Sequence, residues 1–597
     1  MLRKLLFALN LIILFSSCGS DDESATQLQN GNADFIVNYF IEGESIDTAE
    51  EDILIIQPGD IEIQLNQSGT ASLPDLAPGN YTVSDIDLVN FVDPIDFTIE
   101  SNTTTVIDYN IDLTTEQFIE KFGEEEYLKL KMNPTIIEFT DSNIARLETY
   151  SQLQNIFDSN NYIYYWSELG SDILKSASSF GNSFLLDNYS ISTNQAAVFQ
   201  LWTDCYSLIN SANLTIETAE IDSNITNNEQ QSIVAEMRFL RALTYFTLVK
   251  TFNKPILITS TANNLEDIIS NTASPSDIYD TIINDLEFAQ DFLIEKSEPN
   301  LASAQAATAL LGKVYLQMTG APLNDTSKYA TALNYLEELK NQFQLEPNYS
   351  DVFALTNESS NSEVIFSVAF DAQSESEENL GNYGNGSSWF GPFGDNSRSL
   401  EENFINAYFE DNENLESAVK FPIEVVDTRF HQNIITYSSN GNNLTNTEDW
   451  TPNKFTQLET ILNGGDQGVN FPYLRYADVL LMIAEAENAI NGPTQNAYDA
   501  INSVRRRAFG DNNHDLATNL TQDEFLDTIL EERRLELCFE GHRKDDLVRT
   551  GKLAERIELI NVNYNSNRDF SDHESIWPIP QQEIDATGGL LIQNPGY

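Results

Sequence analysis

The sequence predicts a mainly α-helical protein preceded by a small all-β sandwich domain. Between residues 33 and 113, apolar side chains alternate with polar ones, as in Ile61, Ile63 and Leu65, which is typical of strands with one buried face. After about residue 114, the apolar residues recur at steps of three and four, which is the spacing of one face of an α-helix. The change of period therefore separates two structural units.

The first residues have the order of a secretory signal. Basic Arg3 and Lys4 precede an apolar run that is shorter than the roughly 20 residues needed to span a bilayer. Small serines lead into Cys18, and the stretch resembles the lipobox of bacterial lipoproteins, in which the cysteine becomes the lipidated first residue. Ordinary secretion with an incidental cysteine is the alternative. We expect a signal peptide at 1–17 and a lipid-anchored tether at 18–32.

The acidic residues directly behind Cys18 look like the surface-export tag of lipoproteins in the Bacteroidetes group. This resemblance implies a protein anchored by lipid in the outer membrane and facing the outside of the cell.

Composition narrows the classes of ligand. The 597-residue chain has a formal net charge of −62, so it lacks the Lys and Arg excess that neutralises nucleic-acid phosphates. The same charge repels anionic ligands at long range and favours a neutral one. Four scattered histidines and the absence of a zinc or phosphate-binding motif predict no metal and no cofactor. A disulfide between Cys205 and Cys538 remains open.

The predicted β-domain spans residues 33–113. Turn signals at 57–60 and 77–80 punctuate short strand-like runs, as in a small sandwich. The stretch 71–83, "ASLPDLAPGNYTV", resembles carboxypeptidase-regulatory or transthyretin-like modules. We expect this domain to act as a spacer.

The helical part carries a series of collinear motifs. They are "AEMRFLRALTYFTLVKTFNKPIL" (235–257), "AQAATALLGKVYLQM" (304–318), "FPYLRYADVLLMIAEAENAI" (471–490), "ILEERRLELCFEGHRKDDLVRTG" (529–551) and "IWPIPQQEI" (576–584). Together they resemble the SusD/RagB family of outer-membrane nutrient-binding lipoproteins over roughly residues 125–597. The leading β-domain lies outside the usual pattern of that family.

The resemblance implies a SusD-like fold for residues 114–597, with four TPR-like helical hairpins and a loop-rich binding region. Members of the family capture oligosaccharides, less often peptides, at the cell surface. They pass them to a SusC-like TonB-dependent transporter and are not catalytic. A RagB-like peptide binder, a surface glycoside hydrolase and a ligand-free lid for the transporter are the alternatives.

A sugar binder needs exposed aromatic rings beside amide, carboxylate or guanidinium groups. Two aromatic-rich stretches, 161–172 and 381–398, and the shorter stretch 446–455 have this composition. The candidate ligand-binding residues are Tyr164, Tyr165, Trp166, Asp172, Tyr383, Trp389, Phe390, Arg398 and Trp450. Tyr164 and Trp166 fit equally well on the buried face of one helix.

Other conspicuous residues favour structural roles. Acidic and basic side chains alternate at helical spacing near the C-terminus, which predicts an ion-pair network rather than a ligand site. The network residues are Glu532, Arg533, Arg534, Glu536, Arg543 and Asp545. Trp202 and Trp577 have apolar neighbours and are predicted to lie in the core, and Lys454 and Arg475 are predicted to be structural.

Overall fold

The computed structural model divides the chain into two compact units, Met1–Glu138 and Phe139–Tyr597. In the first unit it describes the backbone of the strands between residues 31 and 113. In the second unit it describes 142–157, 159–177, 181–261, 273–294, 298–370, 398–409, 423–437, 442–455, 469–564, 566–589 and 591–597. The predicted signal peptide and Cys18 lie outside the described residues.

Strands occupy the N-terminal stretch in which the alternation predicted them. One four-stranded sheet contains β1 (Gly31–Ile41), β2 (Glu44–Ile46), β5 (Thr70–Leu76) and β8 (Thr105–Leu113). The other has the order β4 (Ile61–Gln64), β3 (Ile53–Gln57), β6 (Gly79–Asp85), β7 (Ile95–Ile99). β8 runs parallel to β1, with Ala33 opposite Thr105, whereas the second sheet is antiparallel throughout. The packing of these sheets into a sandwich stays a prediction.

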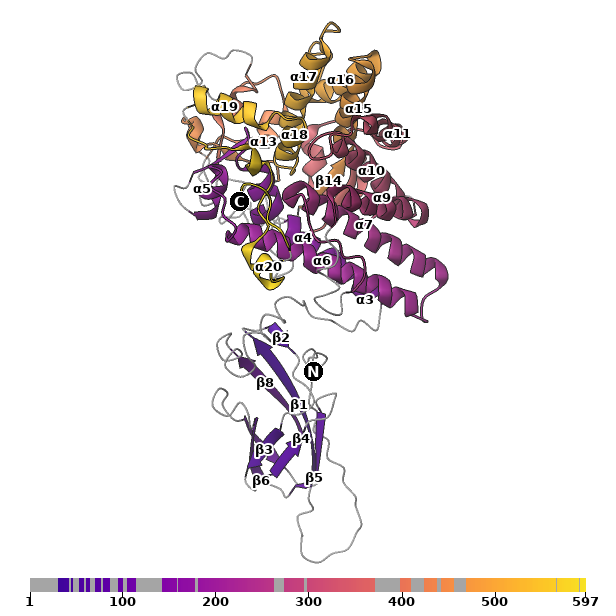
Figure 1. The fold of residues 1–597 in the computed structure, drawn as a ribbon, viewed down its shortest axis with the longest axis vertical. Helices are drawn as coiled ribbons and strands as arrows, with labels where there is room; N and C mark the ends of the chain where they lie inside the picture. Colours follow the sequence, from indigo (N-terminus) through magenta and orange to yellow (C-terminus); the bar gives the residue numbers. More distant parts are fainter. Residues whose placement is uncertain are drawn as a thin grey trace, which may run out of the picture. The chain divides into compact units, whose positions relative to one another are not determined.

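The second unit is mainly helical (Figure 1). Its longer helices are α3 (Ser142–Ser151), α6 (Ala196–Ile221), α7 (Asn227–Phe252), α9 (Pro275–Phe292), α10 (Ala304–Met318), α11 (Tyr329–Glu338), α15 (Tyr476–Asn491), α16 (Gln495–Phe509), α17 (Gln522–Glu536) and α19 (Leu553–Asn563). Neighbours in the chain pack on one another, such as α6 on α7, α10 on α11 and α15 on α16. The division into four TPR-like hairpins stays a prediction.

Shorter elements connect these helices. The helical ones are α4 (Leu153–Phe157), the π-helix η1 (Ser159–Glu168), α5 (Gly181–Asp187), η2 (Thr326–Lys328), η3 (Tyr349–Phe353), η4 (Leu355–Ser360), α12 (Glu402–Asn406), α13 (Arg429–Asn433), η7 (Thr447–Asp449), α18 (Arg543–Arg549), η8 (Asp572–Ser575) and α20 (Gln581–Ala586). The strand pairs are β9 (Leu174–Ser176) with β11 (Arg398–Leu400), β10 (Val364–Val368) with β14 (Phe471–Arg475), and β12 (Ile434–Ile435) with β13 (Thr451–Pro452).

Helix α7 shows why these segments are helical. Its first turn is closed by a capping box, in which the Thr226 side chain and the Glu229 side chain each satisfy a free backbone N–H. The predicted stripe, which includes Phe239 and Phe246, is buried. From Ile233 to Phe252 every residue of the helix except Arg238 is buried, as expected for a helix covered on nearly all sides.

The core contains the two tryptophans that were predicted to lie there, and it shows that the two remaining cysteines are not linked. Trp202 and Trp577 are buried, as predicted, and Phe252 packs edge-on against both. Cys205 and Cys538 are also buried, but they are free thiols, so no disulfide links them. Among the helices of the described ranges, none is both long and apolar enough to cross a membrane.

Candidate functional site

The first aromatic cluster lies on the π-helix η1, and most of it faces the interior. Trp166 is 0% exposed, its ring meets Trp577 edge-on, and its Nε1 donates a hydrogen bond to Asp545 Oδ1 at 2.8 Å. Tyr164 is buried as well. The expectation of an exposed ring at Trp166 is therefore wrong, because the polar edge of the indole is occupied by a carboxylate from α18.

Asp545 anchors η1 to the rest of the unit. Besides the Trp166 bond, it accepts a hydrogen bond from the Tyr162 hydroxyl at 2.6 Å and forms an ion pair with Lys250 of α7. The Lys250 ammonium also contacts the Tyr162 hydroxyl at 2.6 Å. The aromatic-rich sequence of η1 thus serves to hold three distant elements together.

Asp172 is likewise an interior group. Both of its carboxylate oxygens accept hydrogen bonds from Arg543, at 2.6 and 2.7 Å. Burial by itself would raise the pKa of Asp172, but Arg543 and Arg534 outweigh burial and hold that pKa well below its ordinary value. Its predicted role as a polar ligand contact is wrong in this structure, because Asp172 is 0% exposed and a ligand cannot reach its carboxylate.

Trp450 is also 0% exposed. Its Nε1 donates to the Leu444 carbonyl at 2.9 Å, and its ring packs against Phe430. The expected exposure of Trp450 is therefore wrong. Tyr165 is the candidate on η1 that keeps accessible surface: it is half-buried, with its ring tilted against Tyr164 at a centroid distance of 5.2 Å.

The second aromatic stretch stays a prediction. Tyr383, Trp389 and Phe390 lie outside the described residues. The backbone of Arg398 is the first residue of β11 and pairs with Ser176 of β9. The C-terminal end of the stretch is thereby fixed beside the strand that follows η1.

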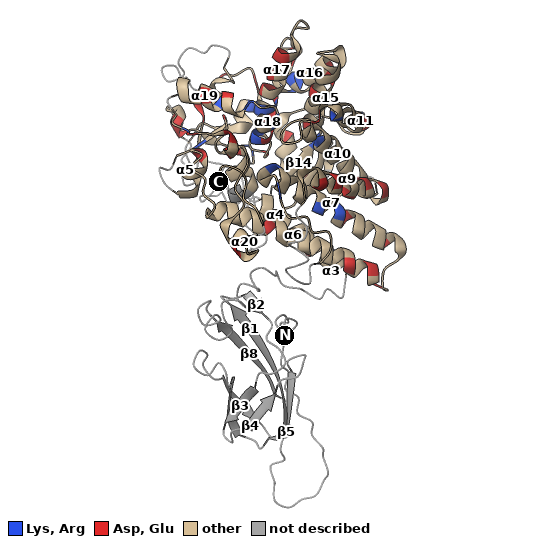
Figure 2. Cartoon of the chain, viewed as in Figure 1, with Lys and Arg blue, Asp and Glu red and all other residues tan. Residues whose placement is uncertain are grey.

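Acidic and basic residues occur together on α17 and α18 (Figure 2). As predicted, they form ion pairs, and many of the partners lie on distant elements. Arg475 donates to Glu536 and Glu540, both at 2.6 Å, and Arg429 donates to Glu532 at 2.6 Å. Burial would raise the pKa of Glu536, but the surrounding arginines lower it far below its ordinary value. These groups are fully engaged with one another, so the network is structural.

Two buried titratable groups depart from the pattern of paired charges, and sequence reasoning missed both. Burial raises the pKa of Glu168 to about 8, although hydrogen bonds from the Gly541 and Phe539 backbones partly oppose the rise. Burial lowers the pKa of Lys544 to about 7, and its ammonium group lies over the Trp166 ring at 4.4 Å. Their positions at the end of η1 and inside α18 gave no signal of this burial.

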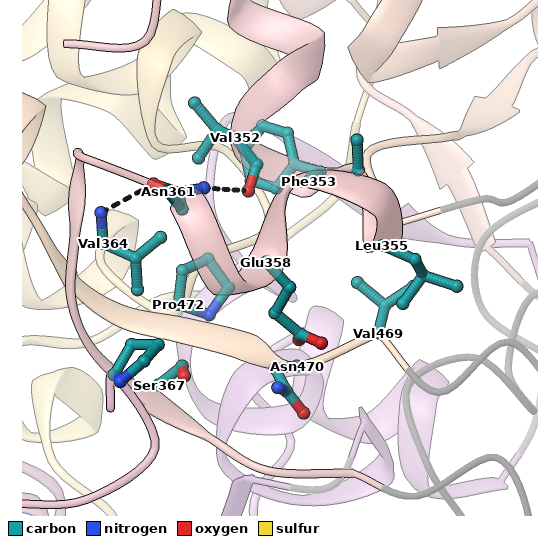
Figure 3. A pocket seen from close by; sticks show the side chains of 12 residues that line it. Val352, Phe353, Leu355, Glu358, Asn361, Val364, Ser367, Val469, Asn470 and Pro472 are labelled. Atoms are coloured by element: carbon teal, nitrogen blue, oxygen red, sulfur yellow. Dashed lines mark hydrogen bonds between the residues drawn. The ribbon is translucent and has the colours of Figure 1, made fainter. Parts of the chain in front are cut away.

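A surface pocket lies between the β10–β14 pair and the short helices η3 and η4 (Figure 3). It encloses about 360 Å³ of space, part of it open to solvent. Its lining residues are Pro299, Val352, Phe353, Ala354, Leu355, Glu358, Asn361, Val364, Ser367, Val469, Asn470 and Pro472. Sequence reasoning missed this pocket. The one available signal was Pro472 inside a strand-like run, because proline in a strand marks a break in the ladder.

The chemistry of the described residues suits binding. The pocket carries one carboxylate, that of Glu358. No group of three His, Cys, Asp or Glu side chains within the described ranges is arranged to hold a metal ion. A hydrolase acting on sugars needs two carboxyl groups facing one groove, and this pocket does not supply them.

Comparison with known proteins gives the family context of this fold. Residues 340–597 match the family described as "SusD family", and residues 127–316 match the family described as "Starch-binding associating with outer membrane". The chain is therefore similar to SusD proteins over these two segments. It is 29% identical over 534 residues to SusD-like protein P25 of Formosa agariphila, which covers 80% of this chain and 96% of that relative.

Solved structures agree with this assignment. A SusD homolog from Bacteroides thetaiotaomicron is 25% identical with a TM-score of 0.65, covering 80% of this chain and 100% of that one. A laminarin-binding SusD-like protein is 26% identical with a TM-score of 0.61, covering 77% of this chain and 99% of that one. These solved structures share the fold of this chain over about four fifths of its length.

Proposed function

We propose that this SusD-like protein captures an oligosaccharide or polysaccharide at the cell surface and delivers it to a SusC-like TonB-dependent transporter. The observation that carries the proposal is the similarity to a laminarin-binding SusD-like protein along 99% of that protein's length. The net charge of −62 favours a neutral glycan, because anionic polymers are repelled. Neutral glucans such as laminarin are the first ligands to test.

The N-terminal part of the chain supplies the attachment in this proposal. Lipid on Cys18 holds the protein to the outer membrane, and the strands between residues 31 and 113 form a sandwich that acts as a spacer. The helical unit then faces outward as four TPR-like hairpins with a binding region. No residue of the attachment is needed for ligand chemistry.

Ligand contact is assigned to the stretch 381–398, with Tyr383, Trp389, Phe390 and Arg398 as its contributors. Aromatic faces stack on the C–H faces of sugar rings, and the many glycines of this stretch make deep burial of Trp389 difficult to arrange. Tyr165 is added because it keeps accessible surface. The buried candidates on η1 hold the scaffold and do not touch the glycan.

The alternatives receive less support. Asp172 and Asp545 are each hydrogen-bonded and paired with a cation in the interior, so neither is available as a hydrolytic acid or base. A RagB-like peptide binder would share the fold, and peptide binding is the outcome to examine if glycans fail.

The test is affinity electrophoresis of residues 19–597 through gels that contain laminarin, a xylan or polygalacturonate, one at a time. We expect retardation by a neutral polysaccharide, and a loss of affinity of about tenfold or more for Trp389→Ala, since aromatic anchors carry 1–2 kcal/mol or more at binding sites. Phe292→Ala is the matched control, because Phe292 is a partly exposed aromatic on α9. Migration unaffected by all three polymers would contradict the proposal, and retardation by polygalacturonate alone would contradict its neutral-ligand part.

A further inference from the structure

The pocket beside β10 exists because the strand ladder is interrupted there. Pro472 of β14 has no backbone N–H to donate. The register slips around it: Phe366 pairs with Leu474, but Val368 pairs with Phe471. The backbone N–H of Ser367, which lies inside this irregularity, leaves the ladder and donates to the Pro299 carbonyl at 2.7 Å. Such bulges re-aim side chains, and here Ser367 becomes part of the pocket wall.

Ser367 brings an unused polar group to the pocket. The residue is 3% exposed, and no hydrogen bond of its hydroxyl is found within the described part of the chain. The hydroxyl is not among the fully enclosed polar atoms that lack a partner, so it keeps some accessible surface at which a ligand can bond it. By contrast, Asn361 in the same pocket is fully used, since its amide donates to the Val352 carbonyl and its oxygen accepts from the Val364 N–H.

Glu358 supplies a second polar group, whose carboxylate can accept further hydrogen bonds. Glu358 is half-buried and lies beside Asn470 in the pocket (Figure 3). The backbone and side chain of Asn470 donate hydrogen bonds to its carboxylate, and burial raises the pKa of Glu358. A carboxylate offers about four acceptor positions, so hydroxyl donors can still be accommodated. Asn470 in turn is held in place, because its Oδ1 accepts from the Phe370 N–H at 2.8 Å.

The remaining walls are apolar and carry no cation. The apolar lining residues are Pro299, Val352, Phe353, Ala354, Leu355, Val364, Val469 and Pro472. No Lys or Arg is among the lining residues. A carboxylate or sulfate group in the ligand would therefore meet Glu358 with no compensating charge, whereas a neutral ring can pack its C–H face on the apolar wall.

We propose that this pocket is a subsite for one neutral pyranose unit, whose hydroxyl groups bond to the Glu358 carboxylate and the Ser367 hydroxyl. The pocket is small, and part of its roughly 360 Å³ is open to solvent, in keeping with contact to a single ring of a ligand that continues outside it. This inference rests on the proposed glycan-binding function and deepens it, because it names groups that select against acidic sugars.

The experiment measures binding of laminarihexaose and of a galacturonate hexamer to residues 19–597 by calorimetry. The variants are Glu358→Gln, Ser367→Ala and Trp389→Ala, with Glu338→Gln on the exposed surface of α11 as the control for loss of one acid. For the neutral hexasaccharide we expect about tenfold weaker binding in Glu358→Gln and about threefold to tenfold in Ser367→Ala, with the control unchanged. We also expect Glu358→Gln to bind the acidic hexamer more tightly than wild type does.

The outcomes separate the two proposals. If Trp389→Ala weakens binding while both pocket variants bind like wild type, glycan capture stands and the subsite is overturned. If wild type binds neither hexasaccharide nor any neutral polymer, the proposed function fails and the subsite fails with it. Thermal unfolding of each variant identifies a folding defect. For a variant with such a defect, a wild-type crystal soaked with laminarihexaose decides: a sugar ring between Glu358 and Ser367 supports the subsite, and an empty pocket beside a glycan bound elsewhere overturns it.

Discussion

Replacing Arg475 with methionine should destabilise the helical unit strongly, although the side chain touches no proposed ligand. Arg475 is buried at the start of α15 and donates to the side chains of Glu363, Glu536 and Glu540 at 2.6–2.8 Å. Methionine fills a similar length without charge. It leaves three buried carboxylates with fewer donors, and buried carboxylates are costly without them.

The remaining contacts set the size of the effect. Without Arg475, Glu540 keeps Lys454 at 2.7 Å, and Glu363 keeps Arg507 at 3.0 Å. Glu536 keeps Arg429 at 3.1 Å. Glu536 also keeps Arg507, which it shares with Glu363. Because each acid retains at least one cation, we expect the usual cost of breaking a single buried pair, about 3–5 kcal/mol in the free energy of unfolding, rather than a multiple of it.

The free energy of unfolding of the second unit is measured by urea unfolding followed by tryptophan fluorescence. All five tryptophans lie after residue 138, so they report only this unit. The control is Arg506→Met. Arg506 pairs with Asp515 at the surface, where the side chains are 45% and 27% exposed, so its loss should cost less than about 1 kcal/mol. A cost for Arg475→Met within 1 kcal/mol of the control would refute the reasoning that burial sets the value of these pairs.

Two further predictions concern the interior. The pKa of Glu168 is raised from 4.5 to about 8 in the folded protein. Below pH 4.5 this side chain is protonated in both the folded and the unfolded state and costs no stability. As the pH rises from 4.5 through 8, the protein loses stability, because the unfolded state releases this proton more easily than the folded state does. Glu168→Gln should therefore gain roughly 3–5 kcal/mol relative to wild type between pH 5 and pH 8 in urea titrations, and a stability difference that does not change with pH would contradict this. At Gly320, an added Cβ would lie 2.1 Å from the Arg549 carbonyl oxygen. Gly320→Ala should lower the urea midpoint markedly, by about 2 kcal/mol or more, whereas Gly492→Ser, at a glycine with open space around it, tests the cost of positive φ alone.

Several structural roles followed from the sequence because they depend on local spacing. The steps of three and four in α7 and α10 predicted helices that the structure contains, and capping residues such as Thr226 mark a start. The acids and bases around Glu532 and Arg533 predicted ion pairs, and the structure contains them, but the partners come from distant elements. Glu532 pairs with Arg429 and Arg533 pairs with Asp478, which the local spacing did not indicate.

The ligand candidates were harder to predict because exposure is not a local property. Trp166 and Asp545 are 379 residues apart, and Asp172 and Arg543 are 371 apart. Nothing in "NYIYYWSELGSD" indicates that a carboxylate from α18 will cap the indole or that an arginine will cover the aspartate. Tyr165, their neighbour in the same stretch, keeps its surface only because of the direction in which η1 points it.

The sequence by itself determined the mainly helical character of the second unit, its similarity to SusD proteins and the prediction that its C-terminal charges form ion pairs, because periodicity, motifs and residue types are written along the chain. Only the tertiary structure decided which aromatic rings are buried, which residues pair with the C-terminal charges and that Ser367 and Glu358 line one pocket. The physical reason is that burial and pKa depend on neighbours brought together by packing across hundreds of residues.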